Sequence, residues 1–207
     1  MIKSFKLFES DSQIEMICED LGIKNFKIVD GLVNVDDNVY LNNRRLTKLP
    51  IKFGEVSGEF HCSNNRLISL DGCPKRVGEI FNCDYNELTS LKGGPNWVGG
   101  DFSCDSNSLT NLKGFPEKVG GNFWCQYNNI FDFRGIGENS LSVYNKFICR
   151  SNPIYEIYRL FEDSESIDLI NEYGVIVNGN VIIKDRLEEV LGIEIPEKLE
   201  FRNYKLI

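Results

Sequence analysis

One period governs most of this chain. Closely similar blocks begin every 21 residues: FHCSNNRLISL at Phe60, FNCDYNELTSL at Phe81, FSCDSNSLTNL at Phe102 and FWCQYNNIFDF at Phe123. A step of 21 back from Phe60 reaches VYLNNRRLTKL, and a step of 24 forward from Phe123 reaches FICRSNPIYEI. A fixed period of roughly 20 to 50 residues is typical of folds in which each repeat stacks on its neighbours. We therefore count six rungs.

Two columns of the repeat indicate a short strand with one buried face. The phenylalanine at the start of each block is followed two residues later by cysteine, and side chains two apart in a strand point to the same side. The cysteines of this column are Cys62, Cys83, Cys104, Cys125 and Cys149. We expect the phenylalanine and cysteine columns to be buried.

The rest of each block predicts a turn and an extended return. The turn column contains Asn65, Asn86, Asn107, Asn128 and Asn152, and stacked asparagines can satisfy the backbone groups that a turn leaves unpaired. Pro74, Pro95 and Pro116 suit an extended return path that is poor in hydrogen bonds and too short for a long helix. The sequence predicts an α+β repeat protein, a leucine-rich-repeat-like parallel β-solenoid of about six 21-residue rungs with helix-plus-hairpin caps at both ends.

The array is expected to occupy residues 39–160, with an N-terminal cap over residues 1–38. A solenoid exposes its core at each end and needs a cap there. Before the repeats, Asp11 or Ser12 can begin a helix that ends at Gly22. The segment FKIVDGLVNV then predicts a hairpin around Asp30–Gly31.

A second cap is expected over residues 161–207. Ser164 or Ser166 can open a helix, VIVNGNVII predicts a hairpin around Asn178–Gly179, and DRLEEVLG predicts a short helix that ends at Gly192. The last residues are expected to add a strand. The three-residue lengthening of the array falls near residues 135–145, which can be either a binding insertion or a bulge.

The repeat pattern F-x-C-x-x-N-x-L-T-S-L resembles the leucine-rich repeat. The phrases GCPKRVGEIF, LTSLKGGPNWVGGDFSC and VYLNNRRLTKLP resemble a leucine-rich-repeat-like protein family of tailed bacteriophages, over about Asn34 to Leu160. The resemblance implies a viral accessory protein that binds a host protein, for example a defence protein, in the host cytoplasm. Gly78, Gly99 and Gly120 depart from the leucine-rich pattern, because a core leucine is expected there, and this departure favours a solenoid flatter than a horseshoe.

Composition excludes several function classes. The net charge of −8 and the lack of a basic stripe disfavour nucleic acid as a partner. No apolar run is long enough for a membrane span, and unpaired cysteines favour a reducing compartment, so we expect a cytoplasmic protein. The cysteines lack the close CxxC pairs of metal sites, and His61 is the sole histidine. We expect no metal, no cofactor and no enzymatic activity.

The outward rows of the strands are the candidate partner-binding surface. Core columns tolerate few residue types, whereas the rows that face solvent can encode a partner. Aromatic and acidic residues gather on these rows, which favours a protein partner with a basic surface. The candidate residues are Tyr40, His61, Asp84, Tyr85, Asp101, Asp105, Trp124, Gln126, Tyr127 and Arg150.

Three other interpretations stay open at this point. The strand face can be an ordinary solvated polar surface. The chain can be a virion component or self-assembly module that pairs through exposed hairpin edges. It can also be a small-ligand-binding protein or an enzyme that uses carboxylates of the strand face, such as Glu59 and Asp84.

Overall fold

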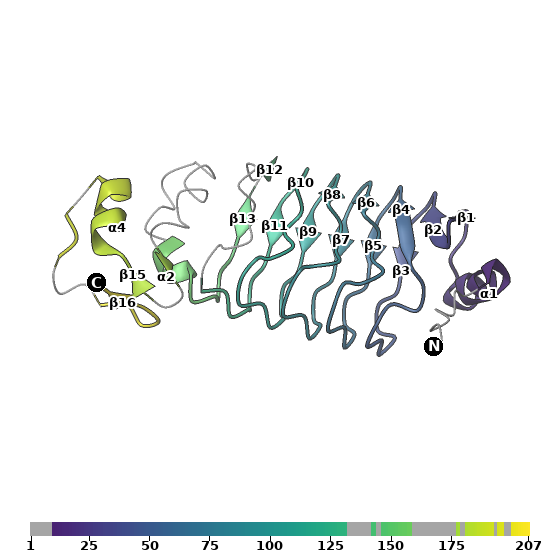
Figure 1. Ribbon diagram of the computed structural model, residues 1–207, viewed down its shortest axis with the longest axis horizontal. Helices are drawn as coiled ribbons and strands as arrows, with labels where there is room; N and C mark the ends of the chain where they lie inside the picture. The colour runs from purple at the N-terminus through teal and green to yellow at the C-terminus, as the bar shows by residue number, and fades with distance from the viewer. Residues whose placement is uncertain are drawn as a thin grey trace, which may run out of the picture.

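The computed structural model describes residues 10–131, 142–143, 146–158, 177–178, 181–192, 194–196 and 200–207. The chain forms an elongated parallel β-solenoid, so the predicted fold class is confirmed. Its rungs stack in a nearly straight row rather than a horseshoe (Figure 1). None of the helices in these residues has the length and apolar character that crossing a membrane requires.

One parallel sheet, here called sheet B, takes a two-residue strand from each rung. In chain order its strands are β3 (Val39–Tyr40), β5 (Phe60–His61), β7 (Phe81–Asn82), β9 (Phe102–Ser103), β11 (Phe123–Trp124) and β13 (Phe147–Ile148). Each strand pairs with the strand one repeat later, and Phe123 pairs with Phe147 across the longer step. The six predicted rungs and their register are confirmed.

A second sheet, here called sheet A, follows the return path. Its parallel strands are β2 (Leu32–Val35), β4 (Phe53–Val56), β6 (Arg76–Val77), β8 (Trp97–Val98), β10 (Lys118–Val119) and β12 (Ser142–Val143), with β1 (Phe26–Val29) antiparallel at the edge. The return path is extended, as predicted, but the expectation that it is poor in hydrogen bonds is wrong. Pro74 lies two residues before β6, so its missing N–H removes no bond from the ladder.

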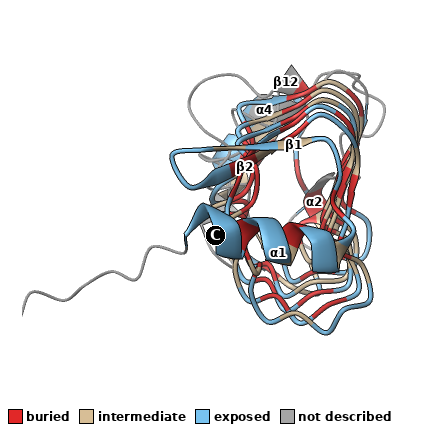
Figure 2. Cartoon of the chain, turned by 90° about the vertical axis from the view of Figure 1, so that its right-hand side faces the viewer, coloured by how far each residue is buried: buried red, intermediate tan, exposed pale blue. Residues whose placement is uncertain are grey.

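The two sheets enclose a dry core of stacked rings. Consecutive phenylalanine rings from Phe60 to Phe147 have centroids 4.9–5.7 Å apart. These rings and the cysteine column are buried. The end view in Figure 2 shows buried backbone segments that recur from rung to rung. Stacked aromatic pairs stabilise a core beyond their area of contact. The burial predicted for both columns is confirmed.

Buried asparagines satisfy the turn of each rung, as predicted. Asn86 Oδ1 accepts the N–H of Leu67 at 2.9 Å, and Asn86 Nδ2 donates to the carbonyl oxygens of Cys62 and Cys83 at 3.0 Å. Asn65, Asn107, Asn128 and Asn152 repeat these contacts in their own rungs. The unusual backbone angle falls one residue earlier than the ladder asparagine, for example at Tyr85, where φ is +52°.

A column of glycines explains the departure from the leucine-rich pattern. Gly78, Gly99 and Gly120 lie at the corner between sheet A and sheet B. A Cβ at Gly99 would overlap the carbonyl oxygen of Gly78, and a Cβ at Gly120 would overlap that of Gly99. Successive rungs therefore approach backbone to backbone at this corner, where a leucine cannot fit.

Helix α1 (Asp11–Leu21) begins at a capping box. Ser10 is the N-cap: its Oγ accepts the N–H of Gln13 at 3.3 Å, and the Gln13 side chain accepts the N–H of Ser10 at 2.9 Å. The prediction of Asp11 or Ser12 as the cap was wrong. Ser10 has Gln13 three residues later, and that spacing makes the reciprocal pair possible; Ser12 has the same spacing to Glu15 but lies inside the helix.

The rest of the N-terminal cap agrees with the sequence. Helix α1 ends at Gly22 and lies across the end of the solenoid, with Ile14 and Cys18 buried (Figure 2). The β1–β2 hairpin turns at Asp30 and Gly31, both with positive φ. It extends sheet A by one antiparallel strand.

The C-terminal elements agree with the sequence where the structure describes them. Short helix α2 (Tyr155–Tyr158) follows the sixth rung, and α4 (Lys184–Leu191) ends at Gly192, as predicted. The predicted hairpin consists of β14 (Val177–Asn178) and β15 (Val181–Ile182), and the last strand, β16 (Lys205–Leu206), pairs parallel with β15. Asn178 pairs with Val181 across this hairpin.

Two predictions fall on other parts of the chain. The helix expected at Ser164 or Ser166 lies outside the described residues. The segment 135–145 is described only at Ser142 and Val143, which form β12.

Candidate protein-binding face

The ten candidate residues lie on one surface, the outer side of sheet B with the corner before it and the turn after it. We call this surface the strand face. Neighbouring rungs are about 4.8 Å apart, so residues 21 positions apart in sequence are direct neighbours across it. Asp101 lies in the corner column, Tyr40, His61 and Trp124 in the first outward column, and Tyr85 and Tyr127 at the turn. Asp84, Asp105, Gln126 and Arg150 form the column between them.

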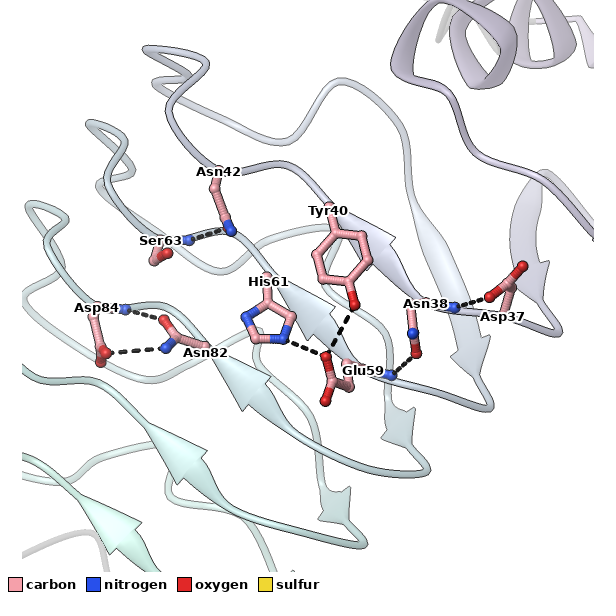
Figure 3. A network of polar contacts seen from close by, with 9 residues as sticks. All are labelled: Asp37, Asn38, Tyr40, Asn42, Glu59, His61, Ser63, Asn82 and Asp84. Atoms are coloured by element: carbon pink, nitrogen blue, oxygen red, sulfur yellow. Dashed lines mark hydrogen bonds and ion pairs between the residues drawn. The ribbon is translucent and has the colours of Figure 1, made fainter.

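At the N-terminal end of the face, a glutamate joins two aromatic side chains. Glu59 Oε2 accepts a hydrogen bond from the Tyr40 hydroxyl at 3.1 Å and lies 2.9 Å from His61 Nε2 (Figure 3). The Tyr40 and His61 rings stack with centroids 5.2 Å apart. The backbone N–H of Glu59 is bonded to Asn38 Oδ1 at 2.8 Å. Glu59 was absent from the candidate residues, although its position two residues before His61 on the same side of the strand indicated it.

The acidic residues in the middle of the face also stabilise the fold. Asp84 Oδ1 accepts the backbone N–H of Asp105 at 2.7 Å, and Asp105 Oδ1 accepts the backbone N–H of Gln126 at 2.6 Å. Likewise, Asn42 Oδ1 accepts the backbone N–H of Ser63 at 3.2 Å. This column is a second side-chain ladder, outside the core, and it positions the two carboxylates on successive rungs.

Burial and mutual repulsion affect these two carboxyl groups. Burial raises the pKa of Asp84, while hydrogen bonds from Ser103 Oγ, the Asp105 N–H and Asn82 lower it. Burial also raises the pKa of Asp105, and the charge of Asp84 raises it further, against the hydrogen bonds from Gln126. In the described part of the chain, neither carboxylate forms an ion pair with a lysine or arginine. No lysine or arginine of the described residues therefore compensates their negative charge.

Asp101 and Trp124 form a similar unit near the middle of the array. Asp101 Oδ1 accepts the backbone N–H of Asn122 at 2.7 Å, and the indole Nε1 of Trp124 donates to Asp101 Oδ2 at 3.4 Å. Trp124 is half-buried. The indole lies against its neighbours and uses its donor within the face.

Tyr85 and Tyr127 are the most exposed aromatic residues of the face. Their relative exposures are 64% and 63%, and both have positive φ, +52° and +53°. Asn64 occupies the same turn position one rung before Tyr85, where asparagine adopts this conformation more readily. Ser106 lies on the rung between the two tyrosines. Two rungs separate the tyrosine backbones, roughly 10 Å at the strand spacing.

The chemistry available on this face is recognition by rings and carboxylates. Among the described residues, no group of three or more potential metal ligands converges. His61 contacts Glu59, but no serine, threonine or cysteine side chain is bonded to it in the part of the chain that the structure describes. Arg150 is exposed on the sixth rung and is the basic member of the predicted set.

A row of side chains on the opposite sheet was not predicted from the sequence. Glu55, Arg76, Trp97 and Lys118 are direct neighbours on the outer side of sheet A. The Arg76 guanidinium lies over the Trp97 ring, with Cζ 3.6 Å from the ring centroid. The 21-residue spacing of these four residues, each one position before a buried valine, was the signal that could have revealed them.

Comparisons with models of protein families, with curated proteins and with solved structures gave no match to this chain.

Proposed function

We propose that this chain is a non-enzymatic repeat module that binds a protein with a basic surface through the strand face. The observation that carries the proposal is the pair of exposed tyrosines, Tyr85 and Tyr127, in the left-handed backbone region. That region costs a residue with a side chain about 1–2 kcal/mol. The fold does not require a ring there, since Asn43 and Asn64 occupy the same position in earlier rungs.

Binding gives a physical reason for tyrosine at these positions. Strained backbone positions concentrate at functional sites, and tyrosine is enriched among the residues that dominate binding energy. Tyr40 adds a third ring, 51% exposed, toward the N-terminal end. Together the three rings span the first five rungs of sheet B.

The charge of the face favours a basic partner. Asp84 and Asp105 lie on neighbouring rungs and have no cationic partner in the described residues, and Asp101 and Glu59 add two more carboxylates. A lysine or arginine of a partner would relieve the repulsion that raises the pKa of Asp105. Such complementarity chiefly increases the rate of association and the choice of partner.

The resemblance of the repeats to a family of tailed bacteriophages supports a more specific proposal. The partner would be a bacterial host protein, and the chain a phage accessory protein that modulates or inhibits it in the host cytoplasm. This step depends on resemblance and not on the chemistry of the face.

The test is affinity capture from bacterial lysate, followed by measurement of the Kd for each captured protein. We expect Tyr85→Asn and Tyr127→Asn each to weaken binding about tenfold or more, and Asp105→Lys to weaken it further. Both asparagine variants should be more stable than the wild type by about 1 kcal/mol. A stabilised protein that binds less tightly cannot be explained by misfolding.

Ile68→Asn is the matched control. Ile68 is 65% exposed, like the two tyrosines, but lies past the turn and outside the strand face. Its replacement by asparagine should leave every Kd unchanged. If the double variant Tyr85→Asn/Tyr127→Asn keeps every partner at wild-type affinity, the strand face is not the binding site.

A further inference from the structure

A hollow of about 480 Å³ lies on the outer side of sheet A, over its strands β1, β2, β4, β6 and β8. Sites for small molecules have volumes of roughly 300 to 1,000 Å³, so this hollow is large enough for one. Lys27 lines it from β1, Glu55 from β4, Arg76 from β6 and Trp97 from β8. None of these residues belongs to the strand face, so the inference is independent of the proposed protein-binding function.

Arg76 is held ready to receive an anion. Its guanidinium stacks on the Trp97 ring at 3.6 Å, and stacking fixes the plane of the group while its N–H donors point outward in that plane. Strand register places Glu55 directly opposite Arg76, where an ion pair could form. Yet in the described residues the Arg76 guanidinium has neither an ion pair nor a hydrogen bond.

Glycine makes room for this arrangement. A Cβ at Gly99 would lie 2.9 Å from the Cη2 atom of Trp97, so the indole lies where a larger residue at 99 would press on it. Gly78 lines the hollow without a side chain. The same glycine column that lets rungs meet at the corner therefore leaves space beside Arg76 and Trp97.

Charges of both signs line the hollow. Lys27 and Arg76 are cations, and Asp36 and Glu55 are carboxylates, so the four charges sum to zero. Lys27 and Glu55 have no side-chain partner in the part of the chain that the structure describes, and Asp36 accepts one hydrogen bond from a serine hydroxyl at 2.9 Å. A dianion would be repelled by the carboxylates, and a simple cation by Lys27 and Arg76. A ligand with one charge of each sign can place its negative group by the two cations and its positive group by the two carboxylates.

We propose that this hollow binds a free α-amino acid. Its carboxylate would receive hydrogen bonds from Arg76 and Lys27, because a guanidinium edge matches the two oxygens of a carboxylate. Its ammonium group would lie by Glu55 and Asp36, and its side chain would lie toward Trp97. Lys118, next to Trp97 on the far side, does not line the hollow and takes no part.

Trp97 supplies the signal for a direct test. The chain has two tryptophans, so in a Trp124→Phe background all indole fluorescence comes from Trp97. Each free L-amino acid is titrated into this protein, and acetate, methylammonium and inorganic phosphate are titrated as probes with one kind of charge. We expect at least one amino acid to change the fluorescence saturably, with a Kd at least about tenfold lower than that of any singly charged probe or phosphate.

Variants then locate the site. Arg76→Met and Glu55→Gln should each raise the Kd about tenfold or more, since each removes charged hydrogen bonds to the ligand. Lys118→Met removes a charge beside the same indole and should leave the Kd unchanged. Thermal unfolding monitored by circular dichroism should give all three variants the wild-type midpoint, because the three replaced residues are exposed.

Three results would overturn the proposal. They are the absence of saturable binding by any amino acid, binding of phosphate or acetate as tight as that of the best amino acid, and an effect of Lys118→Met equal to that of Arg76→Met. Each of them is compatible with the strand-face proposal, so the two proposals can fail separately.

Discussion

Replacing one ladder asparagine should destabilise the whole array. Asn86 is 8% exposed, and its side chain joins two neighbouring rungs. It accepts the N–H of Leu67 and donates to the carbonyl oxygens of Cys62, Cys83 and Asp84 at 3.0–3.2 Å. Asn86→Ala removes all four contacts and leaves only a methyl group to replace them.

The four hydrogen bonds that Asn86→Ala removes differ in how much free energy their loss costs. The carbonyl of Cys62 keeps its bond from Asn65, and that of Cys83 keeps its bond from Asn107. The N–H of Leu67 has no other acceptor in the described residues. The carbonyl of Asp84 keeps its bond from the Asn64 N–H. One buried donor left unpaired costs about 1–3 kcal/mol, and three weakened carbonyls add about 0.5 kcal/mol each. We expect the free energy of unfolding to fall by about 3 kcal/mol.

Urea unfolding monitored by circular dichroism measures this change. Asn129→Ala is the matched control, because Asn129 is exposed and its side chain has no hydrogen bond in the described residues. Its effect should stay within about 0.5 kcal/mol. If Asn86→Ala and Asn129→Ala lower the free energy of unfolding equally, the asparagine ladder does not stabilise the stack as argued.

Three further predictions concern the corner, the carboxylates and the thiols. Gly99→Ala should lower the free energy of unfolding by about 3 kcal/mol, because the added Cβ would overlap the backbone of the neighbouring rung. Gly22→Ala is the control: its Cβ would lie in open space, so it should lower the free energy of unfolding by only about 1 kcal/mol. Equal losses in the two variants would refute the close approach of the rungs. Raised pKa values of Asp84 and Asp105 mean that the stability from these groups is present below the ordinary carboxyl pKa and is lost as pH rises through the raised value. Asp105→Asn, which keeps an oxygen for the Gln126 N–H, should flatten the dependence of stability on pH above the ordinary carboxyl pKa of about 4. Urea unfolding at several pH values that shows the wild-type slope would contradict this. All seven cysteines are buried, so iodoacetamide should label none of them in the native protein and all of them in urea. Mass spectrometry counts the labels. Rapid labelling of the native protein would count against the buried cysteine column.

The sequence predicted what the repeat imposes on every rung. Identical residues at a constant spacing must occupy equivalent places in a stack, so the burial of Phe81 and Cys83 and the ladder position of Asn86 followed from the period. The αL angle was placed on the asparagine but occurs one residue earlier, at Tyr85. Residue preference alone was misleading there, since the ladder asparagine uses its side chain for hydrogen bonds instead.

The sequence did not predict what depends on pairing between rungs. Sheet A was missed because its strands β6, β8 and β10 are two residues long and each follows a proline, which is read as a loop signal. The roles of Asp84 and Asp105 as acceptors for the next rung became visible only with the strand register. The hollow at Arg76 depends on how the strands of sheet A from β1 to β8 pair with one another, and no local pattern encodes that pairing.

Distances across sheet B test the stacked-rung account most directly. Spin labels are attached at Tyr40 and, in separate proteins, at Ser103, Trp124 or Ile148, which face outward on the fourth, fifth and sixth strands. Pulsed electron spin resonance should give separations that grow by about 4.8 Å for each added rung, near 14, 19 and 24 Å. Separations that do not increase in this order, or that increase by much more than one strand spacing per rung, would contradict the stack and the strand face built on it.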